Sequence, residues 1–224
     1  MGPPKDIIIF LKEKCNCLTF IETGTFHGWT SFWASKNFTN VKTIEFSKEI
    51  YETTKDRFKE LENIDFIFGD SRTELKKLMA EHKSNSLFWL DAHWCGSNSY
   101  GEEDQCPLME EIEIINTSKA DSIILIDDAR LFLSPPPLPN SSHFYPGIAE
   151  VIEKLTKIVP REVMVYEDVI ISFPEKIKDD FIAFMQNKIT ADHKKISKQH
   201  EKQYRIKKIR RTIKKAIGYK YWPK

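Results

Sequence analysis

Short runs of β-branched and apolar residues alternate with longer segments of helical periodicity along most of this chain. The five short runs, at residues 17–22, 41–45, 64–68, 87–91 and 122–127, are expected to be strands. Helical periodicity occupies the segments between them, at residues 29–36, 48–61, 72–82 and 107–116. This alternation is typical of βαβ units, because parallel neighbouring strands must be joined by a crossover, which is usually a helix. We therefore predict an α/β fold with a mainly parallel sheet and helices on both of its faces.

The chain departs from this pattern after the fifth run. Residues 134–139 are rich in proline, which excludes regular structure, and we expect an active-site loop there. A helix is expected over residues 147–157. Two further strands, at residues 162–166 and 169–173, are separated by only two residues. That spacing predicts an antiparallel hairpin.

Charge divides the chain into two parts. The 224 residues have a formal net charge of +1, but residues 193–224 hold 13 of the 34 lysines and arginines and a single acid, Glu201. The tail therefore carries +12 and the rest of the chain −11. With 41% hydrophobic residues, the rest of the chain can bury a full core without a metal or a disulfide. We expect one domain over residues 1–192 and a basic tail over residues 193–224.

In the tail, apolar residues recur at helical spacing and cations fill the positions between them. The apolar positions are Ile206, Ile209, Ile213 and Ile217, and the aromatic residues Tyr219, Tyr221 and Trp222 follow. This pattern is typical of a basic amphipathic helix on an anionic membrane surface. Nucleic-acid binding is a second interpretation, which the acidic domain disfavours because it repels phosphates. A dimerising helix and a merely solvated helix are the other interpretations.

No apolar run approaches the roughly 20 residues that cross a bilayer. The N-terminal residues lack the order of a signal peptide. We therefore expect a cytoplasmic protein, which the tail would bring to the inner face of the membrane. The cysteines show no zinc-binding pattern and are expected to be free thiols: Cys15, Cys17, Cys95 and Cys106.

An acid lies at or just after the end of each of the first three expected strands. The candidate ligand-binding residues there are Glu22, Thr23, Gly24 and Thr25 at the first, Glu45 and Phe46 at the second, and Asp70 and Ser71 at the third. In an open α/β sheet, ligands bind outside the carboxyl ends of the strands. Gly24 would let the backbone approach a ligand, and the carboxylate of Glu45 can accept both hydroxyls of a ribose. Asp70 and Ser71 can address an adenine. Each acid alone could be a helix N-cap, but three acidic strand ends in register favour one shared ligand.

These motifs resemble the successive S-adenosylmethionine (SAM) motifs of class I methyltransferases, over residues 17–173. The resemblance implies a Rossmann-like fold whose seven-stranded, mainly parallel sheet has an antiparallel last strand inserted into it. It also implies that SAM is bound by Glu22, Thr23, Gly24, Thr25, Glu45, Phe46, Asp70, Ser71 and Asp91. The chain departs from the commonest first motif at Phe26, where the family usually has a small residue.

The Glu-Thr-Gly start of the first motif is similar to that of macrocin-type sugar O-methyltransferases, which are metal-dependent. Asp91 ends the fourth expected strand, and Asp127 and Asp128 end the fifth. Three carboxylates so close together need a neutralising cation or proton, and oxygen ligands suit Mg²⁺. The resemblance assigns Mg²⁺ binding to Asp91, Asp127 and Asp128. In the alternative interpretation, one of the paired acids caps the following loop and pairs with Arg130.

The resemblance implies methylation of a hydroxyl on a sugar or glycan, such as a surface polysaccharide. A metal would lower the pKa of that hydroxyl, and His93 or Asp91 would take its proton. Aromatic and imidazole side chains expected either to line an acceptor pocket or to pack their loops are Trp94, Tyr100, His143 and Tyr145. Residues 95–105 are expected to form a lid. The other hypotheses are methylation of another small hydroxylated metabolite, an enzyme acting on nucleic acid, and a non-catalytic membrane-associated binding module with the same fold.

Overall fold

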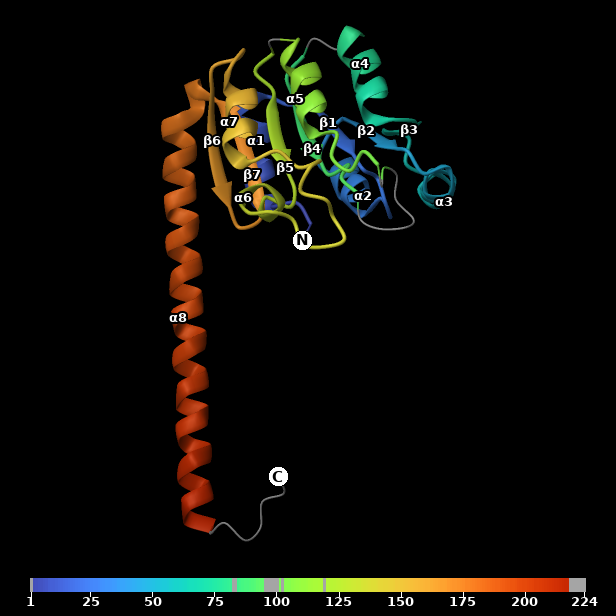
Figure 1. The fold of residues 1–224 in the computed structure, drawn as a ribbon. Helices are drawn as coiled ribbons and strands as arrows, with labels where there is room; N and C mark the ends of the chain where they lie inside the picture. The colour runs from blue at the N-terminus through green and yellow to red at the C-terminus, as the bar shows by residue number, and fades with distance from the viewer. Residues whose placement is uncertain (1, 82–83, 95–100, 102, 119, 218–224) are drawn as a thin grey trace. The chain divides into compact units, whose positions relative to one another are not determined.

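A computed structural model gives the fold of the chain (Figure 1). It describes residues 2–81, 84–94, 101, 103–118 and 120–217, with side chains described to residue 213. The chain divides into two compact units, Met1–Lys178 and Asp179–Lys224. None of the helices in the described ranges combines the length and the apolar character needed to span a bilayer.

The first unit is built on one seven-stranded sheet (Figure 1). Its strands are β1 (Thr19–Thr23), β2 (Asn40–Glu45), β3 (Ile64–Phe68), β4 (Ser86–Leu90), β5 (Ile123–Ile126), β6 (Arg161–Tyr166) and β7 (Val169–Pro174). They lie in the order β3-β2-β1-β4-β5-β7-β6. Strands β1 to β5 pair in parallel, and β7 lies antiparallel between β5 and β6. The predicted sheet is confirmed, including the insertion of its antiparallel last strand.

Helices connect and cover the strands. They are α1 (Lys5–Cys15), α2 (Trp29–Ser35), α3 (Lys48–Arg57), α4 (Ser71–Glu81), α5 (Leu108–Asn116), α6 (Arg130–Leu133) and α7 (Ile148–Thr156). Helix α1 was not predicted, although its buried residues Ile7, Ile8, Leu11 and Cys15 recur at helical spacing. Helix α3 ends before the predicted residue 61, because the backbone leaves the helical region at Phe58. The ring of Phe58 stacks on Phe32 at 5.5 Å.

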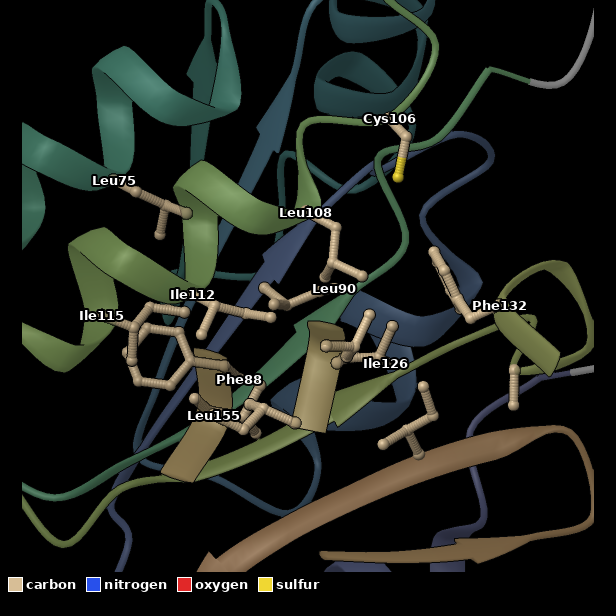
Figure 2. Close-up of a cluster of buried hydrophobic side chains, with 14 of the residues drawn as sticks. Leu75, Phe88, Leu90, Cys106, Leu108, Ile112, Ile115, Ile126, Phe132 and Leu155 are labelled. Carbon is tan, nitrogen blue, oxygen red and sulfur yellow. The ribbon is translucent and has the colours of Figure 1, made fainter. Parts of the chain in front are cut away.

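Both faces of the sheet are buried. Side chains that alternate along a strand point to opposite faces, and one set packs against α4, α5 and α7 (Figure 2). This cluster includes Ile21, Ile44, Leu75, Phe88, Ile112, Ile124 and Leu155. On the other face, the ring centroid of Phe20 lies 5.2 Å from that of Phe38, which follows α2. Every residue of β1, β4 and β5 is buried as a result. This explains the nearly continuous apolar runs of β4 and β5 in the sequence, whereas β1 also buries Thr19, Glu22 and Thr23.

The cysteines that the structure describes agree with the sequence-based expectation. Cys15, Cys17 and Cys106 are buried free thiols, and Cys95 lies outside the described residues.

Helix α8 (Lys178–Ile217) forms the described part of the second unit and follows the short 3-10 helix η1 (Glu175–Ile177). The predicted tail, residues 193–224, begins inside α8. Every side chain from residue 193 to residue 213 is exposed. The three aromatic residues Tyr219, Tyr221 and Trp222 lie outside the described residues.

Candidate functional site

The turn after β1 lies at the carboxyl end of a central strand. Gly24 has a φ of +84°, and a Cβ at this position would lie 2.5 Å from the main-chain oxygen of Asp91, the residue after β4. The N–H of Gly24 donates to the main-chain oxygen of Ile44 in β2 at 3.0 Å. Glycine is therefore required by the close approach of two strand ends, a reason that the sequence did not reveal. The turn is fixed against both neighbours of β1.

Glu22 lies beneath this turn and is 1% exposed. Its Oε2 accepts hydrogen bonds from the hydroxyl of Ser31 and, at 2.7 Å, from that of Thr43. Burial raises the pKa of Glu22 to about 8, although these two hydrogen bonds oppose the rise. Thr43 also bonds to Thr25, with 2.6 Å between the hydroxyl oxygens. We interpret Glu22 as a positioning residue that fixes the turn from inside the sheet.

Glu45, predicted to bind a ribose, is partly exposed at the end of β2. Its Oε2 accepts the N–H of Phe26 at 2.9 Å, and its Oε1 accepts the N–H of Ser47 at 2.8 Å. Each carboxylate oxygen has two lone pairs, so one acceptor remains on each oxygen for a pair of neighbouring hydroxyls. Two exposed aromatic rings accompany this carboxylate. Phe26 donates its main-chain N–H to it, and Phe46 is the next residue in the chain.

Asp70 is the N-cap of α4. Its Oδ1 accepts the N–H of Arg72 at 2.9 Å and that of Thr73 at 3.3 Å. The guanidinium of Arg72 contacts both oxygens of Asp70, at 3.1 and 2.8 Å, and also lies 2.7 Å from Asp104. The hydrogen bond from Arg72 is the main cause that lowers the pKa of Asp70. The N-cap interpretation therefore holds here, and an adenine amine would share this carboxylate with Arg72. Ser71 is buried as the first residue of α4.

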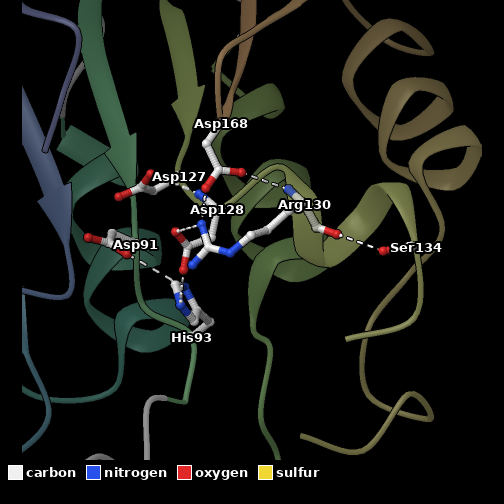
Figure 3. Close-up of polar contacts among 7 residues, drawn as sticks. All are labelled: Asp91, His93, Asp127, Asp128, Arg130, Ser134 and Asp168. Atoms are coloured by element: carbon white, nitrogen blue, oxygen red, sulfur yellow. Dashed lines mark hydrogen bonds and ion pairs between the residues drawn. The ribbon is translucent and has the colours of Figure 1, made fainter. Parts of the chain in front are cut away.

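Strands β4 and β5 bring a second group of acids to the same edge (Figure 3). Leu90 pairs in parallel with Ile126, so the residues that follow them lie side by side. The imidazole of His93 lies between two carboxylates. Its Nδ1 is 3.5 Å from Oδ1 of Asp91, and its Nε2 is 2.9 Å from Oδ2 of Asp128.

A guanidinium extends this group to the turn between β6 and β7. Arg130 lies 2.7 Å from Oδ1 of Asp128 and also contacts the carboxylate of Asp168 (Figure 3). The main-chain N–H of Arg130 donates to Asp168 at 2.9 Å. Acids and cations thus alternate along a row that we call the strand-end cluster: Asp91, His93, Asp128, Arg130 and Asp168.

The environment shifts the pKa values of the strand-end cluster in different directions. Burial raises the pKa of Asp91 to about 7, with a further contribution from the charge of Asp127. Burial would lower the pKa of His93, but the hydrogen bond that its imidazole donates to Asp128 and the nearby carboxylates outweigh it, and the net pKa is raised. Burial opposes ionisation of Asp128, yet His93 and Arg130 lower its pKa to about 2. The pKa of Asp91 therefore lies near 7 and that of His93 lies above its ordinary value, whereas the pKa of Asp128 is low enough to keep this carboxylate ionised.

The predicted Mg²⁺ ligands do not converge on one point. In the part of the chain that the structure describes, no group of three or more His, Cys, Asp or Glu side chains is arranged to hold a metal ion. Asp127 is buried, and its Oδ1 accepts the N–H of Asp128 at 2.8 Å. His93 and Arg130 compensate the charge that was assigned to a metal. The acids as placed do not fit a divalent cation. The sequence-based prediction counted the carboxylates and did not foresee the imidazole and the guanidinium beside them.

The aromatic residues considered for an acceptor pocket lie in different surroundings. Trp94 is buried, and its main-chain N–H donates to the main-chain oxygen of Gln105 at 2.9 Å. Tyr145 is buried in the core, with its ring 6.2 Å from that of Phe132. His143 is exposed. Tyr100 and most of the predicted lid, residues 95–105, lie outside the described residues.

Several residues at this edge were missed by sequence reasoning. They are Ser31, Thr43, Arg72, Glu111 and Asp168. Glu111 of α5 is buried, and this burial raises its pKa to about 7 although hydrogen bonds from the hydroxyls of Ser71 and Thr23 lower it. Its side chain lines a small cavity together with His93 and Asp127. Thr43 faces Glu22 only through the register of β1 and β2. For Asp168, the two-residue hairpin turn was a usable signal, since such turns return to the sheet edge.

Solved structures of methyltransferases are similar to the chain in fold. It aligns with a candidate O-methyltransferase from Klebsiella pneumoniae at a TM-score of 0.56 and 12% identity, covering 78% of this chain and 81% of the other. A methyltransferase of Podospora anserina, solved with S-adenosylhomocysteine (SAH) bound, aligns at 0.53 and 18% identity, covering 78% and 80%. TomG of Streptomyces achromogenes, an O-methyltransferase of tomaymycin synthesis solved with SAM, aligns at 0.51 and 14% identity, covering 78% and 81%.

No protein-family model matches the sequence, and no curated protein is similar to it at a significant level. At such low identities the structural likeness establishes the fold alone. The chain therefore has the class I methyltransferase fold, with the strand order and the inserted antiparallel strand of that class.

Proposed function

We propose that this chain is a SAM-dependent O-methyltransferase. One observation carries the proposal. A single edge of the sheet presents the Gly24 turn and the free acceptors of Glu45 beside a titratable cluster at the ends of β4 and β5. The first group suits a nucleoside cofactor and the second suits removal of a proton. The structural neighbours solved with SAM or SAH share this fold.

The proposed reaction is a direct transfer. The oxygen of an acceptor hydroxyl attacks the sulfonium methyl group of SAM, a new C–O bond forms, and the C–S bond breaks. The electron pair of that bond stays on sulfur, which leaves SAH. The hydroxyl proton passes to the pair formed by Asp91 and His93. The chain then has two tasks, which are to hold the two reactants in line and to accept one proton.

The charges around His93 suit this second task. Asp128 is ionised and orients the imidazole through Nε2, while Asp91 lies near Nδ1. The pKa of Asp91 is raised to about 7 and that of His93 is raised above its ordinary value, so we expect them to titrate as a coupled pair. Activity is therefore expected to rise with pH as this pair loses its proton, and to level off above neutral pH.

The acceptor class rests on the resemblance to the macrocin-type family. A sugar or glycan hydroxyl is the acceptor we propose, and another small hydroxylated metabolite is the alternative. The same resemblance also implies that the reaction depends on a metal. If Mg²⁺ does bind, Asp91, Asp127 and Asp128 are the residues that would hold it and it would acidify the acceptor hydroxyl. The arrangement described above does not need it, because His93 and Arg130 already compensate the acids.

Calorimetry with SAM and SAH tests the cofactor. We expect binding of both without added metal, and an absence of binding would overturn the proposal. Transfer of a labelled methyl group to sugar, glycan, lipid and nucleotide extracts, with and without Mg²⁺, then identifies the acceptor class. The Asp127→Asn variant separates the metal question. Equal turnover of variant and wild type, with no response to Mg²⁺ or chelator, would exclude a metal at this site, whereas a Mg²⁺ response that is lost in the variant would establish one.

A further inference from the structure

The second half of α8 is a charged helical surface that its own unit leaves exposed. Residues 193–213 contain nine lysines and arginines and one acid, Glu201, and every side chain in the range is exposed. Among these residues the ion pair that the structure shows is Arg205 with Glu201, at 3.9 Å. Cations four residues apart, such as Lys198 and Lys202, repel each other along a helix. This segment is therefore expected to gain stability from an anionic partner.

The unbroken course of α8 determines which residues share a face (Figure 1). Positions three or four apart lie together on a helix. One continuous row therefore contains Lys198, Lys202, Ile206, Ile209 and Ile213. The isoleucines are 41%, 58% and 43% exposed, which is unusual for three apolar side chains in one row. The row begins with cations and ends with an apolar stripe, and further cations flank the stripe.

We propose that this face of α8 docks on an anionic lipid surface. Lysines would contact lipid headgroups while Ile206, Ile209 and Ile213 enter the boundary between headgroups and acyl chains. A second copy of this helix is a poorer occupant, because it carries the same excess of cations. Nucleic acid matches the charge but offers no comparable apolar layer for three isoleucines. The proposal does not depend on the methyl-transfer reaction.

Sedimentation of the full chain with vesicles tests this proposal. We expect binding to vesicles of equal parts phosphatidylglycerol and phosphatidylcholine, little binding to phosphatidylcholine alone, and weakening as salt rises. Circular dichroism of each variant checks that helicity is retained. Light scattering of the free chain reports its oligomeric state.

Two sets of variants separate charge from apolar insertion. Replacing Lys194, Lys198 and Lys202 by Gln is expected to weaken binding about a hundredfold, at about fivefold per cation. Replacing Ile209 by Ser is expected to weaken it about tenfold, because an apolar side chain no longer enters the interface. Ile196→Ser is the matched control, since Ile196 is 49% exposed on the same helix but lies outside this row.

Three results would overturn the proposal. The first is no binding to the anionic vesicles at low salt. The second is that Ile209→Ser and Ile196→Ser weaken vesicle binding equally, or that neither weakens it. The third is a preference for nucleic acid or for self-association, seen as displacement from vesicles by duplex DNA or as a dimer that Ile209→Ser dissociates. Loss of SAM binding in the same preparations would bear only on the proposed function.

Discussion

The two halves of the carboxyl edge of the sheet treat their acids differently. At β1 and β2, the acids accept hydrogen bonds from neutral groups: Glu22 from two hydroxyls and Glu45 from two main-chain N–H groups. At β4 and β5, Asp128 instead faces the cationic side chains of His93 and Arg130. Neutral donors fix a geometry without moving charge, whereas an alternating row of acids and cations can take up a proton and redistribute it. This difference supports the proposal that the first half binds the cofactor and the second takes the proton.

The largest expected effect tests the proton-transfer half. His93→Asn removes the proton acceptor and should lower kcat about 100- to 10,000-fold, while the affinity for SAM stays unchanged. Initial rates and calorimetry measure the two quantities. His143→Asn is the control, because His143 is exposed on a different loop. A variant with the wild-type rate would show that the proton leaves by another route.

Gly24→Ala tests whether the two halves depend on one another. The new Cβ would lie 2.5 Å from the backbone of Asp91, at a φ of +84°. We expect a loss of about 2–4 kcal/mol in the free energy of unfolding, from overpacking and from the unfavourable backbone conformation. Chemical denaturation measures it. Gly147→Ala is the control, since its Cβ would meet only one atom at an ordinary 3.6 Å. Equal stability of both variants would contradict the close approach of β1 and β4.

Glu45→Ala tests the cofactor half by itself. Removing the carboxylate leaves the N–H groups of Phe26 and Ser47 without their acceptor and takes away the proposed partner of the ribose. The Kd for SAM is expected to rise about 10- to 100-fold, the equivalent of roughly one or two strong hydrogen bonds. Glu49→Ala, on the exposed surface of α3, is the control. If both variants bind SAM equally well, Glu45 does not contact the cofactor.

The last test concerns the pH dependence of stability. Burial raises the pKa of Glu22 from 4.5 to about 8, so the folded chain keeps a proton that the unfolded chain releases. The stabilising contribution of this group is complete below pH 4.5 and is lost as pH rises through about 8. Glu22→Gln is neutral throughout, so its free energy of unfolding should fall less than that of the wild type between pH 5 and pH 8. Denaturation at several pH values measures this, with Glu60→Gln as an exposed control. Parallel pH profiles of variant and wild type would show that Glu22 is ionised in the folded chain.

The sequence alone determined the order and kind of most elements. Apolar runs of strand length, separated by helical periods, are local properties, and they predicted all seven strands and the hairpin that inserts β7. Ligand positions at strand ends followed, because parallel strands end at one edge. Helix α1 was missed although its spacing was readable in the sequence.

Only the tertiary structure decided what each polar residue does. Thr43 reaches Glu22, Gly24 meets Asp91, and Arg72 bridges Asp70 and Asp104, through contacts between residues distant along the chain. The same holds for His93 and Arg130, which lie beside Asp128 where the sequence predicted a metal. Periodicity fixes which way a side chain points along its own strand, but strand register and loop path fix its neighbours, and those neighbours determine its charge and its chemistry.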